Sequence, residues 1–312
     1  MPRWNWCLIV AGAAALVLLD AQALFAWGPA THVKLAGDVL ANLSLLPAGV
    51  AAIVARHVCD YVYGSLATDM VFAKRLSRIK QFCHHWSTGF RLLNEADDDR
   101  SRSFAYGYLS HLAADTVAHG KFVPHQIVTT GTTVNIGHLY WEARADAQTE
   151  DRTRAQLEST LLMDHRTHDA ALARVWTETF LPYGLNRALF RGISRTTARR
   201  SWRRSAETWG RWSRRRLPAD LLARYHAECT DRTISLLSRE RRSALLSEDP
   251  NGTAALAFAA DARRGWRRRR RHGLPLFHRP VEVAAGHAPR PWPRHEHPKE
   301  CTCAGALVHC HT

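Results

Sequence analysis

Apolar residues recur every three or four positions along much of the chain, a pattern typical of amphipathic helices. Such spacing predicts helices in three stretches: after Trp27, between 148 and 189, and between 221 and 246. The periodicity stops near residue 260, where Pro, Arg and His become the dominant residues. Segments of that composition bury too little apolar surface to fold, so residues 261–312 are predicted to be a disordered tail.

The first apolar run is of a different kind. It extends from Cys7 to Leu19, follows the positively charged Arg3, and precedes the small residue Ala26. This order is typical of a secretory signal peptide, and the run is shorter than the ~20 residues of a membrane span. We therefore expect residues 1–26 to be removed after Ala26, giving a secreted or periplasmic protein that begins at Trp27. A retained N-terminal anchor is the alternative.

Polar residues interrupt the apolar pattern in one helical segment. His111, Asp115 and His119 are spaced four residues apart, and no Pro or Gly occurs between Leu109 and His119. On a helix this spacing places the three side chains on one face, within reach of a shared cation. His138 and Glu142 repeat the spacing in the segment that follows. Imidazole and carboxylate groups are ligands of catalytic Zn²⁺, so these residues predict a metal site.

The sequences HLAADTVAH (residues 111–119) and GHLYWE (137–142) resemble the zinc-dependent phospholipase C family, which is related to the S1/P1-type nucleases. The resemblance implies an all-α fold, a single multi-helix catalytic domain over residues 27–194. It also implies a cofactor of three Zn²⁺ ions and hydrolysis of phosphoric ester bonds. In this family a free N-terminal Trp contributes to the metal site, which gives the expected cleavage before Trp27 a chemical role.

The resemblance also implies how the ligands divide among the metals. The first zinc would use Asp69, His84 and His111, the second His119, His138 and Glu142, and the third Trp27 and His32, with Asp115 bridging the first and third. Asp69 is also the candidate catalytic base. Clustered Zn²⁺ ions cancel phosphate charge and activate water, which suits phosphodiester hydrolysis.

Two ligand choices depend on neighbouring residues. His84 and His85 are adjacent, and adjacent residues on a helix point about 100° apart, so only one of them can face the site. We favour His84. For the upstream carboxylate we favour Asp69, which follows the small-residue segment YGSLATD, over Asp60, which lies in the middle of a predicted helix.

Three further histidines are not among the predicted metal ligands. His125 is a reserve candidate for the position of His119, because the interval from Asp115 is shorter here than in the best-known bacterial phospholipases C. His165 and His168 fall outside the motif order, and we expect them at the surface. The Cys- and His-rich ending over 301–311 matches no zinc module of structural sites.

The expected activity is that of a phospholipase C, with a phospholipid or a membrane surface as partner and no obligate protein partner inferred. An S1/P1-type single-strand nuclease is the enzyme alternative, although GHLYWE has the spacing HxxxE where those nucleases have HxxxD. A non-catalytic, zinc-stabilised helical binding domain is the second alternative.

Charge is distributed unevenly along the chain. Residues 27–194 carry 17 Lys and Arg against 16 Asp and Glu, whereas residues 195–312 carry 25 against 11. The segment 195–260 is therefore expected to be a basic helical extension, followed by the tail. Arginine runs such as RRGWRRRRRH (263–272) can bind anionic surfaces through their charge, although a solvated tail without a partner has the same composition.

Overall fold

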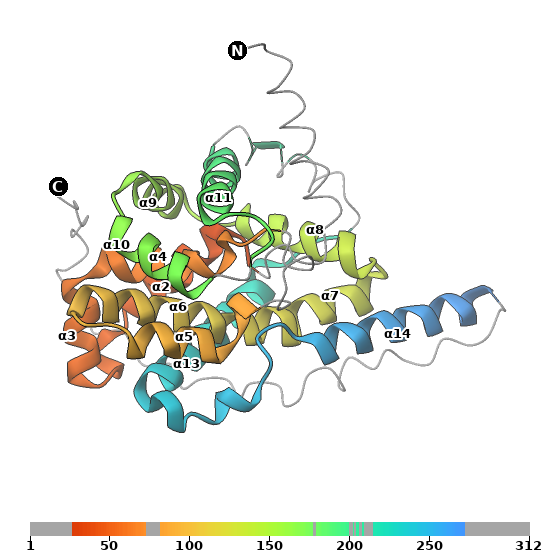
Figure 1. Ribbon diagram of the computed structural model, residues 1–312. Helices are drawn as coiled ribbons and strands as arrows, with labels where there is room; N and C mark the ends of the chain where they lie inside the picture. Colours follow the sequence, from red (N-terminus) through yellow and green to blue (C-terminus); the bar gives the residue numbers. More distant parts are fainter. Residues whose placement is uncertain are drawn as a thin grey trace, which may run out of the picture.

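The computed structural model describes residues 27–72, 82–176, 179–199, 202, 204–205, 208 and 215–271, without the side chains of 135–136 and 269–271. Within these ranges the chain forms helices and no strand, which confirms the all-α, single-domain prediction (Figure 1). The helices are, in chain order, α2 (Pro29–Leu40), η1 (Leu43–Leu45), α3 (Ala48–Arg56), α4 (Val58–Ala67), η2 (Thr68–Met70), η3 (Phe82–His84), α5 (Trp86–Asn94), α6 (Asp99–Val117), η4 (Ala118–Phe122), α7 (Val123–Thr130), α8 (Val134–Asp146), α9 (Asp151–Leu162), α10 (Arg166–Val175), α11 (Tyr183–Ala198), α13 (Ala219–Arg239), η5 (Glu240–Arg242), η6 (Ala244–Ser247) and α14 (Thr253–Arg271). None of these helices has both the length and the apolar character of a membrane span.

Helix α6 forms the centre of the fold. Every residue from Ser103 to Val117 is buried, because α4, α5 and α13 pack around the helix (Figure 1). Its first turn is capped by Asp98, whose carboxylate accepts a hydrogen bond from the Ser101 amide at 2.7 Å. Such a cap satisfies an amide that the helix itself leaves without a partner. The helix that carries His111 and Asp115 is therefore enclosed on all sides over these fifteen residues.

Two glycines allow α4 to cross α6 at very close range. A Cβ atom at Gly64 would lie 2.0 Å from the carbonyl oxygen of Phe104, and one at Gly107 would lie 2.0 Å from that of Tyr61. No side chain fits at either position, so the two backbones approach each other directly. This crossing brings the C-terminal end of α4, which leads into Asp69, beside the polar face of α6.

The C-terminal helices belong to the same core. Helix α13 packs against α6 and α2, and α14 packs against α7 and η4. Leu222, Leu236 and Leu237 of α13 are buried, so this helix presents an apolar stripe to the rest of the domain. Residues 219–239 of the expected basic helical extension are helical, and they pack into the core of the domain rather than outside it. Helix α14 also continues to Arg271, which differs from the disorder expected from residue 261 onwards.

Several sequence predictions fall outside the described residues. These are the signal peptide over 1–26, the Cys- and His-rich ending over 301–311, and the tail from residue 272 onwards. The expected cleavage after Ala26 remains a prediction for the same reason.

Candidate metal centre

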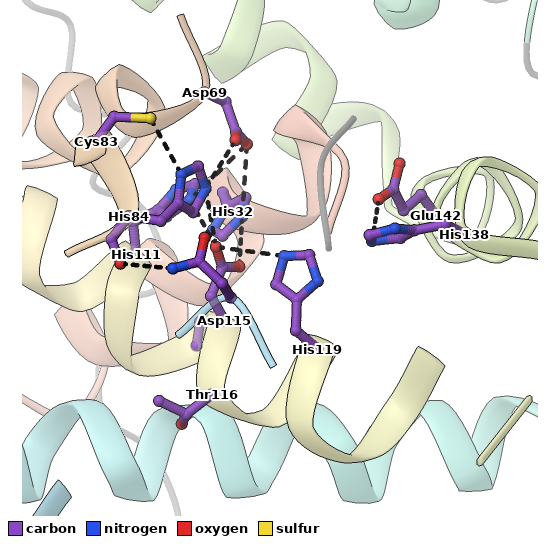
Figure 2. Close-up of polar contacts among 12 residues, drawn as sticks. His32, Asp69, Cys83, His84, His111, Asp115, Thr116, His119, His138 and Glu142 are labelled. Atoms are coloured by element: carbon purple, nitrogen blue, oxygen red, sulfur yellow. Dashed lines mark hydrogen bonds and ion pairs between the residues drawn. The ribbon is translucent and has the colours of Figure 1, made fainter. Parts of the chain in front are cut away.

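Five of the predicted ligands gather in one buried cluster at the centre of the molecule. They come from α2 (His32), η2 (Asp69), η3 (His84) and α6 (His111 and Asp115), and none exposes more than 3% of its surface. Figure 2 shows these side chains pointing toward one another, although their positions in the chain span some eighty residues. The cluster forms where the close crossing of α4 and α6 meets the start of α2.

Asp115 lies at the middle of this cluster. Its Oδ2 atom is 3.1 Å from Nε2 of His111 and 3.3 Å from Nε2 of His84, while its Oδ1 atom is 3.6 Å from Nε2 of His32. Burial opposes ionisation of this carboxyl group, but the neighbouring His111 and His84 hold the pKa of Asp115 well below its usual range. Asp115 is therefore an anion that faces imidazoles from three different elements.

Asp69 faces the same imidazoles from the other side. Its Oδ1 atom is 3.3 Å from Nε2 of His84, and its Oδ2 atom is 3.8 Å from Nε2 of His111 and 3.9 Å from Nε2 of His32. The rings of His32 and His111 stack with their centroids 3.7 Å apart. Two carboxylates and three imidazoles thus face one another in one buried cluster.

The donor atoms of this cluster fit a bound cation. Among the described residues, Nε2 of His32, Nε2 of His111 and both carboxylate oxygens of Asp115 have no hydrogen-bond partner. Buried polar atoms in that state are costly unless a ligand or ion satisfies them. Nδ1 of His111 lies 2.8 Å from the carbonyl oxygen of Ser65, which orients Nε2 toward the cluster as the outer partner of a metal-binding His does.

The protonation state of His32 also fits a bound cation. Burial, followed by the nearby His111, lowers the pKa of His32 to about 3, against the opposing effect of Asp115 and Asp69. A neutral imidazole keeps the lone pair that a metal needs. One ligand atom from each of His32, Asp69 and His111 lies within 4.8 Å of the other two, and His84, His111 and Asp115 form a second such group.

A second group lies beside the first. His138 and Glu142, one turn apart on α8, are buried, with Nε2 of His138 3.1 Å from Oε1 of Glu142. The ring of His119 lies 4.8 Å from that of His138, and Nε2 of His119 is 3.9 Å from Oδ2 of Asp115. His119 therefore lies between the two groups (Figure 2), on the π-helical turn η4 that continues α6. Such turns often occur at functional sites.

Trp27 is held next to these groups by its indole ring. The residue is fully buried, its ring stacks on Phe122 with centroids 4.5 Å apart, and the ring of His226 meets it edge-on at 5.3 Å. Trp27 leads directly into α2, which carries His32 into the central cluster. Of the nine predicted ligands, all are buried, and eight of them take part in the two groups of imidazoles and carboxylates described above.

The structure also separates the alternatives that the sequence left open. His84 lies in the cluster, whereas His85 is exposed. Asp60 lies elsewhere, 2.7 Å from Nε2 of His168. The reserve candidate His125 instead contacts the hydroxyl of Tyr225, with Nδ1 at 3.1 Å.

Two histidines expected at the surface are buried, so that prediction is wrong. His165 stacks on Tyr63 with ring centroids 3.5 Å apart, and its Nε2 lies 2.8 Å from the carbonyl oxygen of Thr160. His168 stacks on Phe104 and reaches Asp60. Both rings are buried against aromatic residues of α4 and α6, and each finds a polar partner, His165 in the Thr160 carbonyl of α9 and His168 in Asp60 of α4.

Residues beyond the motifs complete the walls of the site. In the loop between η6 and α14, the Asn251 amide donates a hydrogen bond to the carbonyl oxygen of His84 at 3.4 Å. A Cβ atom on the next residue, Gly252, would lie 2.4 Å from the carbonyl carbon and oxygen of His119. Nothing in the sequence near residue 251 indicates this contact, because it depends on how α13 folds back over α6.

Comparison with known proteins agrees with this geometry. The family model described as zinc dependent phospholipase C matches residues 31–188, just over half of the chain. The matched span contains every predicted ligand except Trp27, and it ends before α13 and α14. A search of curated proteins and a search of solved structures each found no match. The buried His and Asp groups agree with the zinc dependence of the matched family, whose members act as hydrolases of phosphoric esters. On these grounds the chain belongs to the zinc-dependent phospholipase C family.

Proposed function

We propose that the protein is a phospholipase C that uses three zinc ions to hydrolyse the headgroup phosphodiester of phospholipids. The observation that carries this proposal is the ring of buried imidazoles around Asp115, whose oxygens have no hydrogen-bond partner among the described residues. A purely structural polar cluster would satisfy these atoms internally.

The proposed division of ligands is that of the family: Asp69, His84 and His111 for the first zinc, His119, His138 and Glu142 for the second, and Trp27 and His32 for the third, with Asp115 as the bridge between the first and third. The two oxygens of Asp115 support the bridging role. Oδ2 faces His84 and His111, whereas Oδ1 faces His32. Each oxygen is thus directed at the imidazoles of a different proposed metal.

When bound, clustered zinc ions neutralise phosphate charge and lower the pKa of water from about 16 to roughly 7. The residues of the chain hold and orient that centre. Asp69, with its Oδ1 and Oδ2 atoms facing different imidazoles, is the proposed general base in addition to its role as a ligand. The Ser65 carbonyl keeps His111 oriented, and the 251–252 loop contacts the backbone of His84 and His119.

The membrane is the proposed partner, and helix α14 is the proposed contact. Arg264, Arg267 and Arg268 are exposed on this helix, and Asp261, which pairs with Arg264, is its one carboxylate. Partial burial, followed by the charges of Arg267 and Arg264, lowers the pKa of Arg263. This crowding of positive charge favours an anionic surface, since anionic lipids attract arginines near the membrane. We further propose that the protein is secreted or periplasmic, with cleavage after Ala26.

The first experiment measures the zinc content of the purified protein by mass spectrometry, together with its N-terminal sequence. We expect about three zinc ions per chain and Trp27 as the first residue. Hydrolysis of phosphatidylcholine is then compared with hydrolysis of single-stranded DNA and RNA.

The matched variants are Asp115→Asn in the cluster and Asp38→Asn at the surface of α2, where Asp38 pairs with Lys34. Loss of partners that only orient a ligand costs about 10–100-fold. We therefore expect Asp115→Asn to lose zinc and at least about 100-fold in activity, with Asp38→Asn unchanged. Nucleic acid hydrolysis without phospholipid hydrolysis would make the protein a nuclease. Wild-type protein with one zinc ion or none would rule out the three-zinc mechanism.

A further inference from the structure

The carboxylate of Asp146, at the C-terminal end of α8, caps the N-terminus of α2. Its Oδ1 atom accepts hydrogen bonds from the amide of Thr31 at 2.8 Å and from the hydroxyl of Thr31 at 2.6 Å, and its Oδ2 atom accepts one from the amide of Ala30 at 3.2 Å. Asp146 is buried, as are both residues that donate to it. A carboxylate at the start of a helix is stabilised by the free amides and by the helix dipole.

The backbone fits around this carboxylate without space to spare. A Cβ atom at Gly28 would lie 2.3 Å from the Cγ atom and from the Oδ2 atom of Asp146. Gly28 is the residue that precedes α2, and it has no side chain with which to cap the helix. The cap therefore comes from a residue 115 positions away in the chain rather than from a local one.

Asp146 also lies on the same helix as the second ligand group, His138 and Glu142. It lies one turn after Glu142 and two turns after His138, so the three residues share one face of α8. The same helix face thus holds the His138–Glu142 pair at one end and the start of α2 at the other. The segment held in this way is the one that leads from Trp27 to His32.

We propose that Asp146 is a positioning residue of the metal centre, which holds the Trp27–His32 segment at a set distance from His138 and Glu142. It touches neither metal nor substrate in this role. It acts through the backbone of Ala30 and Thr31, whose neighbour His32 carries the Nε2 atom facing Asp115. This inference rests on the three-zinc function proposed above and adds the residue that sets the separation of the second and third metal positions.

The test compares zinc retention in four proteins: wild type, Asp146→Asn, Thr31→Val and Asp169→Asn. The substitution by Asn keeps the size of residue 146 but replaces one acceptor oxygen by an amide that faces other donors. Thr31→Val removes the hydroxyl donor alone and leaves both backbone amides in place. Asp169 is the matched control, a buried carboxylate that pairs with Tyr63, Tyr183 and Arg187 on another side of the domain.

Each protein is dialysed against a graded series of chelator concentrations, and the bound zinc is counted by mass spectrometry. Melting temperatures are recorded in parallel. We expect Asp146→Asn to hold its weakest zinc about 10–100-fold less tightly, the range typical of residues that orient ligands. Thr31→Val should lie between this variant and wild type. Asp169→Asn should lower the melting temperature while it retains zinc as wild type does.

The inference is overturned if Asp146→Asn melts at a lower temperature yet keeps all its zinc with wild-type affinity, since that is the behaviour of a helix cap alone. If Asp146→Asn does not fold, Thr31→Val decides, and wild-type zinc affinity in that folded variant overturns the inference. Failure of the proposed function looks different, because wild type itself would then bind fewer than three zinc ions.

Discussion

Asp115 faces four of the other candidate ligands. Four imidazoles approach its two oxygens, at distances from 3.1 Å for His111 to 3.9 Å for His119. The spacing of Asp115 from these two histidines along one helix is readable from the sequence. His32 and His84 lie on α2 and η3, and the sequence does not show that these two elements pack beside α6.

Asp60 provides a residue-scale prediction about pH. Although burial opposes it, hydrogen bonds from His168 and Arg100 hold the pKa of Asp60 below the ordinary value of 3.8. A carboxyl group with a depressed pKa in the folded state stabilises the fold above pH 4 and loses that contribution as the pH falls through the folded pKa. We expect Asp60→Asn to be less stable than wild type at neutral pH, with a smaller loss of stability below pH 4.

Urea unfolding from pH 2 to 7 measures this difference, with Asp38→Asn as the surface control. Parallel stability profiles for wild type and Asp60→Asn would show that the Asp60–His168 pair contributes nothing to the acid sensitivity of the fold.

The limits of sequence analysis are clearest at this scale. The spacing of four residues grouped His111 with Asp115, and their side chains lie 3.1 Å apart. The angle between neighbours indicated only that one of His84 and His85 could face the site, and His84 is the one that lies in the cluster. His165 and His168 were misplaced because polar residues are exposed by default, whereas here their buried partners lie on other helices. Asp146 shares the spacing of His138 and Glu142, but its partner Thr31 is 115 residues away. Local spacing carries no information about such a contact.

At the scale of elements, the crossing of α4 and α6 determines where the ligands meet. Helices were expected around Asp60 and His111, but the direct contact of backbones at Gly64 and Gly107 follows from three-dimensional packing. The crossing places Asp69, just after α4, within 3.8 Å of His111 on α6. A substitution that moves α4 away from α6 would therefore also move Asp69 away from His111.

We expect Gly107→Ala to destabilise the protein, because the new Cβ would lie 2.0 Å from the carbonyl oxygen of Tyr61 and must separate the helices. Overpacking of this kind costs about 1–3 kcal/mol, sometimes more. Gly192→Ala on α11 is the control, since no neighbouring atom lies within 4 Å of the position that its Cβ would take. It should be neutral or stabilising by about 0.5–1 kcal/mol. Denaturant unfolding compares the two, and equal stabilities would contradict direct contact at the crossing.

A second prediction concerns the turn that carries His119. Gly252 has φ of 59° and packs against the backbone of His119, whereas Gly131 has φ of 68° and nothing within 4 Å. Alanine at either position carries a backbone strain of about 1–2 kcal/mol. We expect Gly252→Ala alone to displace His119, and therefore to lose zinc at lower chelator concentrations than wild type does. Equal zinc retention in Gly252→Ala and Gly131→Ala would show that the loop does not position His119.

At the scale of the whole molecule, the domain extends beyond the span that matches the family. Helices α13 and α14 lie after residue 188, yet α13 packs against the central helix and α14 packs beside α7 (Figure 1). The change in charge after residue 195 suggested an appended segment. The buried leucines of α13 show instead that a basic average composition can include an apolar stripe that completes the core.

The exposed arginines of α14 lead to a prediction about membranes. Each arginine near an anionic bilayer contributes about 1 kcal/mol, so the triple variant of Arg264, Arg267 and Arg268 to Gln should weaken binding about 100-fold. Sedimentation with phosphatidylglycerol-containing vesicles and with pure phosphatidylcholine vesicles measures this. The control replaces with Gln three arginines that are exposed on other helices, namely Arg91 on α5, Arg102 on α6 and Arg152 on α9. Hydrolysis of a short-chain, soluble phospholipid should not change.

Added salt should weaken vesicle binding by wild type, because screening shortens the reach of surface charge. Equal losses in the two triple variants would contradict a specific role of α14. Binding of RNA in preference to vesicles would assign the arginines to another partner.

The burial of Trp27 has a consequence for the order in which the parts of the protein fold. Its indole ring rests against Phe122 and His226, and the second of these lies on α13, near the other end of the described chain. Synthesis proceeds from the N-terminus, so the first residue of this segment is made long before the helix that encloses it. The pocket for Trp27 does not exist until α13 has folded back over α6. Burial of Trp27 is therefore a late step of folding, which follows synthesis of the chain as far as α13.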